Sequence, residues 1–300
     1  MNRSFNWKQY LENYPDLVKV GINNENNAIK HWVNYGKNEY RTDKPLQQSI
    51  VVPVKQRVLP DIKQVVPKTQ SVVPLNNDNM DLLKLKIIQD NIKLIHGSFN
   101  MEIPEMLMSV KFLNGNEKVL EIGSNIGRNT FIIASILNSK YNNNFVTLEC
   151  NPVIYNQLMV NKQNNNLNFH TENSALSAKY MFSKGWDSMC KDTPDIPVGF
   201  IKVNTIKYNE LVNKYKINFD TLVLDCEGSF YYILLDFPEI LNNIKLIITE
   251  NDYMNMEHLN YVTATLMNNG FKNVYRKPLL DKNSIFNKIS KDRFFEVWKK

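Results

Sequence analysis

The segment at residues 119–127, with the sequence VLEIGSNIG, constrains the fold of this chain more than any other part. A short apolar run leads into a turn that contains Gly123 and Gly127, and a run with helical spacing follows at residues 128–137. A buried parallel strand, a tight turn and a helix N-terminus form a cradle for a nucleotide-like ligand. Gly123 allows a backbone angle that a side chain would forbid, and Gly127 lets the helix approach the strand closely.

The spacing within this turn indicates which ligand it suits. The pattern Glu121-x-Gly123-x-Asn125-x-Gly127 differs from the Gly-x-Gly-x-x-Gly fingerprint of dinucleotide sites. It favours S-adenosylmethionine over NAD. We therefore expect Gly123, Ser124, Asn125 and Gly127 to hold this cofactor, and Glu121 to orient its methionine end. The alternative for Glu121 is a carboxylate that only stabilises the turn.

Apolar and amphipathic runs alternate along the rest of the chain. Strands are expected at residues 119–122, 144–149, 167–171, 219–225 and 245–250, and a closing antiparallel pair at 271–276 and 293–298. Helices are expected at residues 80–95, 101–113, 128–137, 152–163, 209–215, 231–241 and 257–269. This order predicts an α/β fold with a doubly wound, Rossmann-like sheet. Residues 177–204 are expected to be irregular, with Tyr180, Phe182 and Trp186 in a lid or sugar-stacking loop.

Acidic residues stand at the ends of four expected strands: Glu121, Glu149, Asp225 and Glu250. Ligands of such sheets bind at the carboxyl ends of the strands, so these side chains should border one crevice. Glu149 ends the second strand, where a carboxylate accepts hydrogen bonds from both ribose hydroxyls. The residues after the third strand, Asn173, Ser174 and Ala175, are expected near the adenine ring.

Four motifs occur together in an order that is specific as a set. They are VLEIGSNIG at 119–127, ECNP at 149–152, NSALS at 173–177 and LDCEG at 224–228. Over residues 110–255 the sequence resembles the FkbM-type methyltransferases, which are similar to other class I S-adenosylmethionine-dependent enzymes. The resemblance implies a class I methyltransferase sheet, S-adenosylmethionine as cofactor and a sugar or natural-product hydroxyl as acceptor.

The resemblance also implies roles for individual residues. It implies cofactor binding by Glu121, Gly123, Gly127 and Glu149, and active-site roles for Asp225 and Glu227. The family often carries a lysine and a glutamate at two positions where this chain has Val223 and Phe230. These departures keep open a scaffold that has the fold without turnover.

A hydroxyl acceptor needs help to lose its proton, so a general base is expected. Asp225, with Glu227 close behind, is the candidate for this base or for orienting the acceptor, and Glu250 is a third catalytic candidate. Asp225 with Glu250 and Asn251 also fits an oxygen-ligand Mg²⁺ site, which makes a divalent metal an option but not the expectation. Cys226 is expected to be a small buried filler.

The first part of the chain has a different character. Residues 1–43 show two short amphipathic helices and resemble a short helical motif that accompanies sugar-modifying and surface-polysaccharide proteins. Residues 44–78 contain a heptapeptide repeat whose proline recurs at 53, 60, 67 and 74, which predicts an extended linker. The remaining residues, 79–300, would form the methyltransferase domain. The module would bind a glycan-assembly partner, or serve only for packing or self-association.

Composition narrows the function classes. No apolar run reaches the length of a membrane span, and the first eight residues lack the apolar core of a secretory signal. Three scattered cysteines indicate a reducing compartment, so we expect a cytoplasmic protein. The net charge is +6, but residues 44–75 carry five cationic side chains against one acidic, so no basic stripe indicates nucleic-acid binding.

Together these features predict an S-adenosylmethionine-dependent O-methyltransferase that acts on a sugar or glycan hydroxyl. The alternatives are methylation of another small molecule or of a protein, and a non-catalytic scaffold in glycan assembly.

Overall fold

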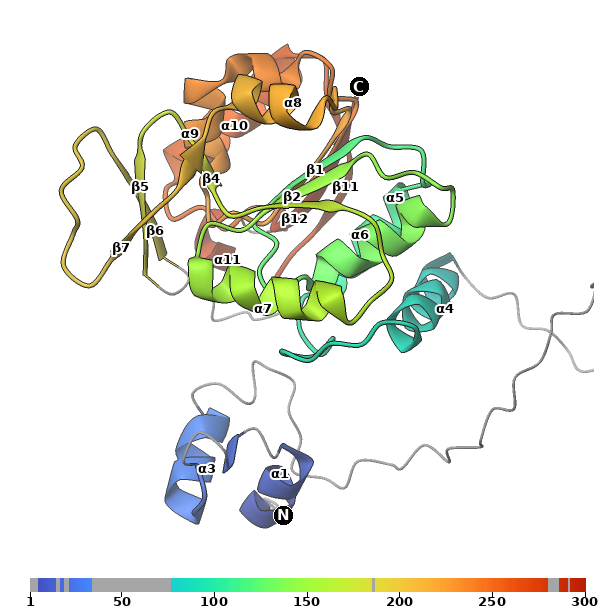
Figure 1. The fold of residues 1–300 in the computed structure, drawn as a ribbon, viewed down its shortest axis with the longest axis vertical. Helices are drawn as coiled ribbons and strands as arrows, with labels where there is room; N and C mark the ends of the chain where they lie inside the picture. Colours follow the sequence, from blue (N-terminus) through green and yellow to red (C-terminus); the bar gives the residue numbers. More distant parts are fainter. Residues whose placement is uncertain are drawn as a thin grey trace, which may run out of the picture. The chain divides into compact units, whose positions relative to one another are not determined.

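The chain divides into two compact units, Met1–Asn76 and Asn77–Lys300. The computed structural model describes residues 5–14, 17–18, 22–33, 77–184, 187–279, 286–290 and 292–300 (Figure 1). Residues 44–76 of the expected proline-repeat linker lie outside the described residues, and so does Trp186. Within the described part, no helix is both long enough and apolar enough to cross a membrane.

The first unit contains two short helices around an aromatic core. They are α1 (Trp7–Asn13) and α3 (Glu25–His31), each begun by an asparagine side chain that accepts a backbone N–H. Tyr10 is fully buried, and its hydroxyl lies 3.0 Å from Nδ1 of His31. Trp32 packs edge-on against Tyr10 with ring centroids 5.5 Å apart. These contacts join the two helices into one small core.

The second unit is built on a seven-stranded sheet. Its strands are β1 (Val119–Ile122), β2 (Phe145–Leu148), β3 (His170–Glu172), β9 (Thr221–Leu224), β10 (Leu246–Glu250), β11 (Lys272–Lys277) and β12 (Phe295–Lys299). Their order across the sheet is β11-β12-β10-β9-β1-β2-β3. The strand β12 is antiparallel to both of its neighbours, β10 and β11, and all the other strand pairs are parallel. The strand order reverses between β1 and β9, so the predicted doubly wound sheet is confirmed.

Helices cover both faces of this sheet (Figure 1). Those described are α4 (Asn77–Asp90), α5 (Ile103–Phe112), α6 (Arg128–Asn138), α7 (Pro152–Gln163), α8 (Tyr208–Tyr215), α9 (Phe230–Asp236), α10 (Met256–Asn268) and α11 (Phe286–Ile289). Successive strand residues face opposite sides. Leu120 therefore packs in the core with α8, α9 and α10, while Val119 packs in the core with α5, α6 and α7.

Several expected helix boundaries differ from the structure, and two of the differences have a clear reading. The helix α4 begins at Asn77, inside the stretch that was expected to be linker. The expected helix at 231–241 is split, because α9 ends at Asp236 and a 3-10 turn, Pro238–Leu241, follows. Proline has no N–H to donate and clashes with the preceding turn, so Pro238 cannot continue the helix.

The prediction that residues 177–204 are irregular was wrong. They contain an antiparallel sheet of β5 (Tyr180–Lys184), β6 (Asp187–Lys191) and β7 (Ile201–Val203), in the order β6-β5-β7. The centre of β5 is buried, with Phe182 fully covered. Beside it, β4 (Ala175–Leu176) pairs in parallel with β8 (Thr205–Ile206).

Candidate active site

The glycine turn after β1 lies against the end of β9. Gly123 has φ +91°, and a Cβ added to it would come within 1.6 Å of the carbonyl oxygen of Asp225. Gly127 has φ +100° and begins α6, where a Cβ would lie 2.6 Å from the ring of Phe131. Both positions therefore require glycine, and the carboxyl ends of β1 and β9 meet at the point where the strand order reverses.

We expect Gly123→Ala to lower the free energy of unfolding by about 3 kcal/mol. The added Cβ would overlap with the backbone of Asp225, and alanine is also strained at a positive φ. Gly270→Ala is the matched control, since Gly270 has φ +85° but no atom within 4 Å of its added Cβ. It should cost about 1 kcal/mol from strain alone. Urea unfolding measures both variants, and equal losses would contradict the close approach at Gly123.

Glu149 follows β2 and holds two loops with its carboxylate. Its Oε2 accepts the N–H of Asn125 at 2.9 Å, and its Oε1 accepts the N–H of Asn151 at 2.8 Å. The amide of Asn173 donates to the backbone carbonyl of Glu149 at 2.8 Å. Burial raises the pKa of Glu149, while the N–H groups of Asn151 and Asn125 oppose that rise. Each carboxylate oxygen retains a second lone pair for a ligand hydroxyl.

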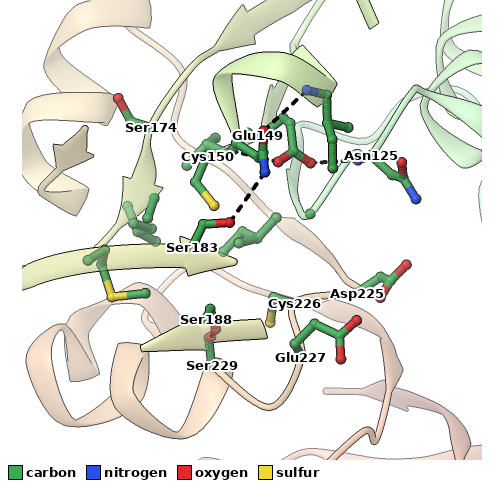
Figure 2. A pocket seen from close by; sticks show the side chains of 18 of the residues that line it. Asn125, Glu149, Cys150, Ser174, Ser183, Ser188, Asp225, Cys226, Glu227 and Ser229 are labelled. Carbon is green, nitrogen blue, oxygen red and sulfur yellow. Dashed lines mark hydrogen bonds between the residues drawn. The ribbon is translucent and has the colours of Figure 1, made fainter. Parts of the chain in front are cut away.

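A cleft of about 800 Å³, partly open to solvent, lies at this edge of the sheet. Figure 2 shows Glu149 and Cys150 on one side of it and Asp225, Cys226 and Glu227 on the other. The charged side chains that line it are Glu149, Asp225 and Glu227, and no Lys, Arg or His is among its described lining residues. These carboxyl groups therefore give the cleft an acidic lining.

The cleft brings together seven of the twelve residues expected in the site: Gly123, Asn125, Glu149, Ser174, Ala175, Asp225 and Glu227. The other five lie around it without lining it: Glu121, Ser124, Gly127, Asn173 and Glu250. Of these five, Ser124 and Asn173 support the loops, because their side chains donate to the backbone carbonyls of Leu148 and Glu149.

Glu121 is buried beneath the glycine turn. Its Oε2 accepts the hydroxyls of Thr130 and Thr147, both at 2.6 Å. Burial raises its pKa from 4.5 to about 7, against the effect of these two hydrogen bonds. The structure thus places Glu121 where it links β1, β2 and α6, and its cofactor role stays a prediction.

The buried Glu121 predicts a pH-dependent stability. The folded protein keeps this proton up to about pH 7, whereas the unfolded chain loses it near pH 4.5, so the free energy of unfolding falls as the pH rises between these values. We expect this fall to be about 1 kcal/mol per pH unit shallower in Glu121→Gln than in the unaltered chain. Urea unfolding at about pH 5, 6 and 7 measures the slope, and the same slope in both proteins would contradict the prediction.

Asp225 and Glu227 are positioned by a strained turn after β9. Glu227 has φ +52°, which is unusual for a residue with a side chain, and Gly228 has φ +73°. The N–H of Gly228 donates to Oδ1 of Asp252 at 2.6 Å, which fixes this turn from the loop after β10. Burial, with the nearby carboxylates of Glu102 and Asp252, raises the pKa of Asp225 well above its usual value. A carboxylate with a raised pKa is a stronger base.

Two acidic residues that the sequence reasoning missed, Glu102 and Glu105, lie near Asp225. Glu105 on α5 and Glu250 at the end of β10 hydrogen-bond to each other, and burial raises the pKa of Glu105 to about 7. Glu102 pairs with Arg128 at 2.6 Å. Glu102 and Glu105 precede the glycine turn by about twenty residues, and only the folding of α5 onto β10 reveals their position.

The geometry gives the metal option no support. In the described ranges, no group of three or more His, Cys, Asp or Glu side chains is arranged to hold a metal ion. The amide of Asn251 donates instead to the carbonyl of Arg293 at 2.6 Å and to Glu296 at 2.9 Å. Cys226 lines the cleft, and burial raises the pKa of its thiol, so it stays protonated and is a poor nucleophile.

No protein-family model matches this sequence, and no curated protein matches it. Among solved structures, an O-methyltransferase from Bacillus cereus in complex with S-adenosylhomocysteine is 12% identical, covers 75% of this chain and 92% of its own, and has a TM-score of 0.41. A ribosomal protein L11 methylase from Lactobacillus delbrueckii subsp. bulgaricus is 10% identical, with 65% and 74% covered and a TM-score of 0.36. A protein of the NADB-Rossmann superfamily from Streptococcus agalactiae is 14% identical, with 65% and 67% covered and a TM-score of 0.40. At these values the similarities assign no activity to this chain.

Proposed function

We propose that this chain is an S-adenosylmethionine-dependent methyltransferase. One observation carries the proposal. A cleft lies where the strand order of the doubly wound sheet reverses, and its acidic lining residues are Glu149, Asp225 and Glu227. A dinucleotide brings phosphates, which carboxylates repel. S-adenosylmethionine instead combines a nucleoside with a sulfonium and an ammonium group, so its charge complements the cleft.

The residues present fit this cofactor. Gly123 lines the cleft, and the lack of a side chain there lets the glycine turn pack against the carbonyl of Asp225. Glu149 would accept hydrogen bonds from the two ribose hydroxyls while it keeps the N–H groups of Asn125 and Asn151. Ser174 and Ala175 would border the adenine ring. When bound, the cofactor supplies a methyl group on a sulfonium centre.

The acceptor is proposed to be a hydroxyl group on a sugar or glycan. Asp225 lines the cleft, and its raised pKa suits a group that takes the hydroxyl proton as the oxygen attacks. Glu227, held on the turn fixed by Asp252, would orient the acceptor. The Glu105–Glu250 pair would support Asp225 from beneath rather than touch the acceptor.

The two departures from the family pattern leave these groups in place. Val223 is buried at 3% exposure in the core on the α5, α6 and α7 face, and Phe230 is buried at 1% in the opposite core. Neither residue lines the cleft. This supports an enzyme over a scaffold without turnover.

Isothermal titration tests the cofactor, and labelling tests the acceptor. We expect S-adenosylmethionine and S-adenosylhomocysteine to bind and NAD not to bind; NAD binding alone would overturn the proposal. Radiolabelled methyl donor offered with neutral monosaccharides, oligosaccharides, amines, protein and RNA then identifies the acceptor. Label only in protein or amines would favour the second candidate, methylation of a non-sugar acceptor, which the all-carboxylate cleft also suits.

The role of the first unit belongs to the same proposal. Its core around Tyr10 and Trp32 makes it a small folded module, and we propose that residues 1–43 bind a protein of glycan assembly. Pull-down with the full chain and with a chain that begins at Asn77 tests this role, and equal capture of glycan-assembly proteins by both would contradict it.

A further inference from the structure

A second cavity lies next to the cleft, between the strands β5 and β6 and the helix α9; it is open to solvent, and its volume is about 390 Å³ with that open space included. The two share part of their walls, including Met181, Ser188, Glu227 and Ser229. Figure 2 shows Ser188 beside Ser229, with Glu227 further along the same wall. The hydroxyls of Ser188 and Ser229 lie 3.2 Å apart, which ties the hairpin to the start of α9. The second cavity is therefore continuous with the proposed methyl-transfer site.

One wall of this cavity offers hydrogen-bonding groups. Ser177, Ser188 and Ser229 bring hydroxyls, which both donate and accept. Glu227 and Asp236 bring carboxylates, which accept only. One oxygen of Asp236 accepts the N–H of Ala178 at 3.2 Å, which orients the group and leaves further lone pairs. A ligand here must bring hydrogen-bond donors.

The remaining lining is apolar and carries one aromatic ring. Leu176, Met181, Cys190 and Ile233 line the cavity together with Tyr232. The ring of Tyr232 is 42% exposed, and its edge-on contacts with Tyr231 and His258 place the centroids 5.0 Å and 5.4 Å apart. An aromatic ring fixed in this way provides a flat apolar surface next to a hydrogen-bonding wall.

We infer that this cavity binds a sugar ring that bears no negative charge, as the acceptor of the proposed reaction. A pyranose has a C–H face that packs on an aromatic ring and a rim of hydroxyls that donates to carboxylates and serines. No Lys, Arg or His is among the described lining residues, so a carboxylate or phosphate on that ring would be repelled by Glu227 and Asp236. The inference rests on the proposed function and narrows its acceptor class.

Saturation-transfer NMR with the full chain tests this inference. The probes are glucose, galactose and mannose, each at millimolar concentration, and glucuronic and galacturonic acid as ring-matched anions. We expect saturation of at least one neutral sugar and little of either acid. Saturation of no neutral sugar, or equal saturation of the acids, would overturn the inference.

Two tyrosine variants locate the site. Tyr232→Ala should weaken sugar binding by about tenfold, because it removes the platform. Tyr261→Ala is the control, since Tyr261 is similarly exposed at 39% and contacts Tyr231 but does not line the cavity. Equal losses in the two variants would place sugar binding elsewhere and overturn the inference.

Titration with S-adenosylhomocysteine separates this inference from the proposed function. Both tyrosine variants should bind it as the unaltered chain does, because neither residue lines the main cleft. Cofactor binding without saturation of any neutral sugar would reject the sugar site and leave the cofactor proposal standing. Sugar binding without cofactor binding would reject the methyltransferase and, with it, the acceptor role of this cavity.

Discussion

Replacing Glu149 by alanine is expected to weaken binding of S-adenosylmethionine by about 100-fold or more. In the proposed pose, the two ribose hydroxyls would lose their hydrogen bonds to the carboxylate of Glu149, and each bond is worth about 1.5–3 kcal/mol. The variant also frees the N–H groups of Asn125 and Asn151, which the carboxylate holds at 2.9 Å and 2.8 Å. Isothermal titration measures the affinity, and an unchanged dissociation constant would defeat the proposed pose.

Glu117→Ala provides a closely matched control for this experiment. Both glutamates are 8% exposed, and Glu117 also accepts two backbone N–H groups, those of Asn114 and Gly115, each at 2.8 Å. It precedes β1, at the opposite edge of the sheet from the cleft. The two variants should therefore lose similar stability in urea unfolding, while only Glu149→Ala loses cofactor affinity.

Asp225→Asn is expected to reduce the rate of methyl transfer at saturating substrates by about 100-fold to 10,000-fold, because an amide cannot take the acceptor proton. Cofactor affinity should change little, since Glu149 and the glycine turn remain. The variant should also unfold no more easily than the unaltered chain. Burial and the nearby carboxyl groups of Glu102, Glu105 and Asp252 already disfavour a charge at this position, and the amide carries none.

Asp220→Asn is the control for the catalytic variant. Asp220 precedes the same strand, β9, and its carboxylate accepts the N–H of Lys118 at 2.9 Å at the amino end of the sheet. It should affect stability and leave the rate of transfer unchanged. A full rate in Asp225→Asn, measured with the acceptor that the labelling experiment identifies, would remove Asp225 from the mechanism.

The sheet could be predicted from the sequence because its signals are local. The strands β1 and β9 are mainly apolar and are buried at every residue, which is typical of central parallel strands. Glycines and asparagines mark the turns between elements. The carboxylates that end these strands could therefore be placed at one edge without knowledge of any contact, and Glu149, Asp225 and Glu227 do line one cleft.

The parts that could not be predicted depend on contacts between distant segments. The strands β5, β6 and β7 are only five, five and three residues long, so each is too short for an alternation of apolar and polar residues to reveal a strand. Glu105 and Asp252 belong to ordinary-looking segments, and only tertiary packing brings them near Asp225.

The position of β12 has a consequence for synthesis of the chain. This strand hydrogen-bonds to β10 on one side and to β11 on the other, and it buries Phe295, Val297 and Trp298. During translation, segments fold as they emerge, N-terminal ones first. The nascent sheet therefore lacks the strand between β10 and β11 until residues 295–299 have emerged. A chain truncated before residue 295 would leave that gap open to pairing with other chains.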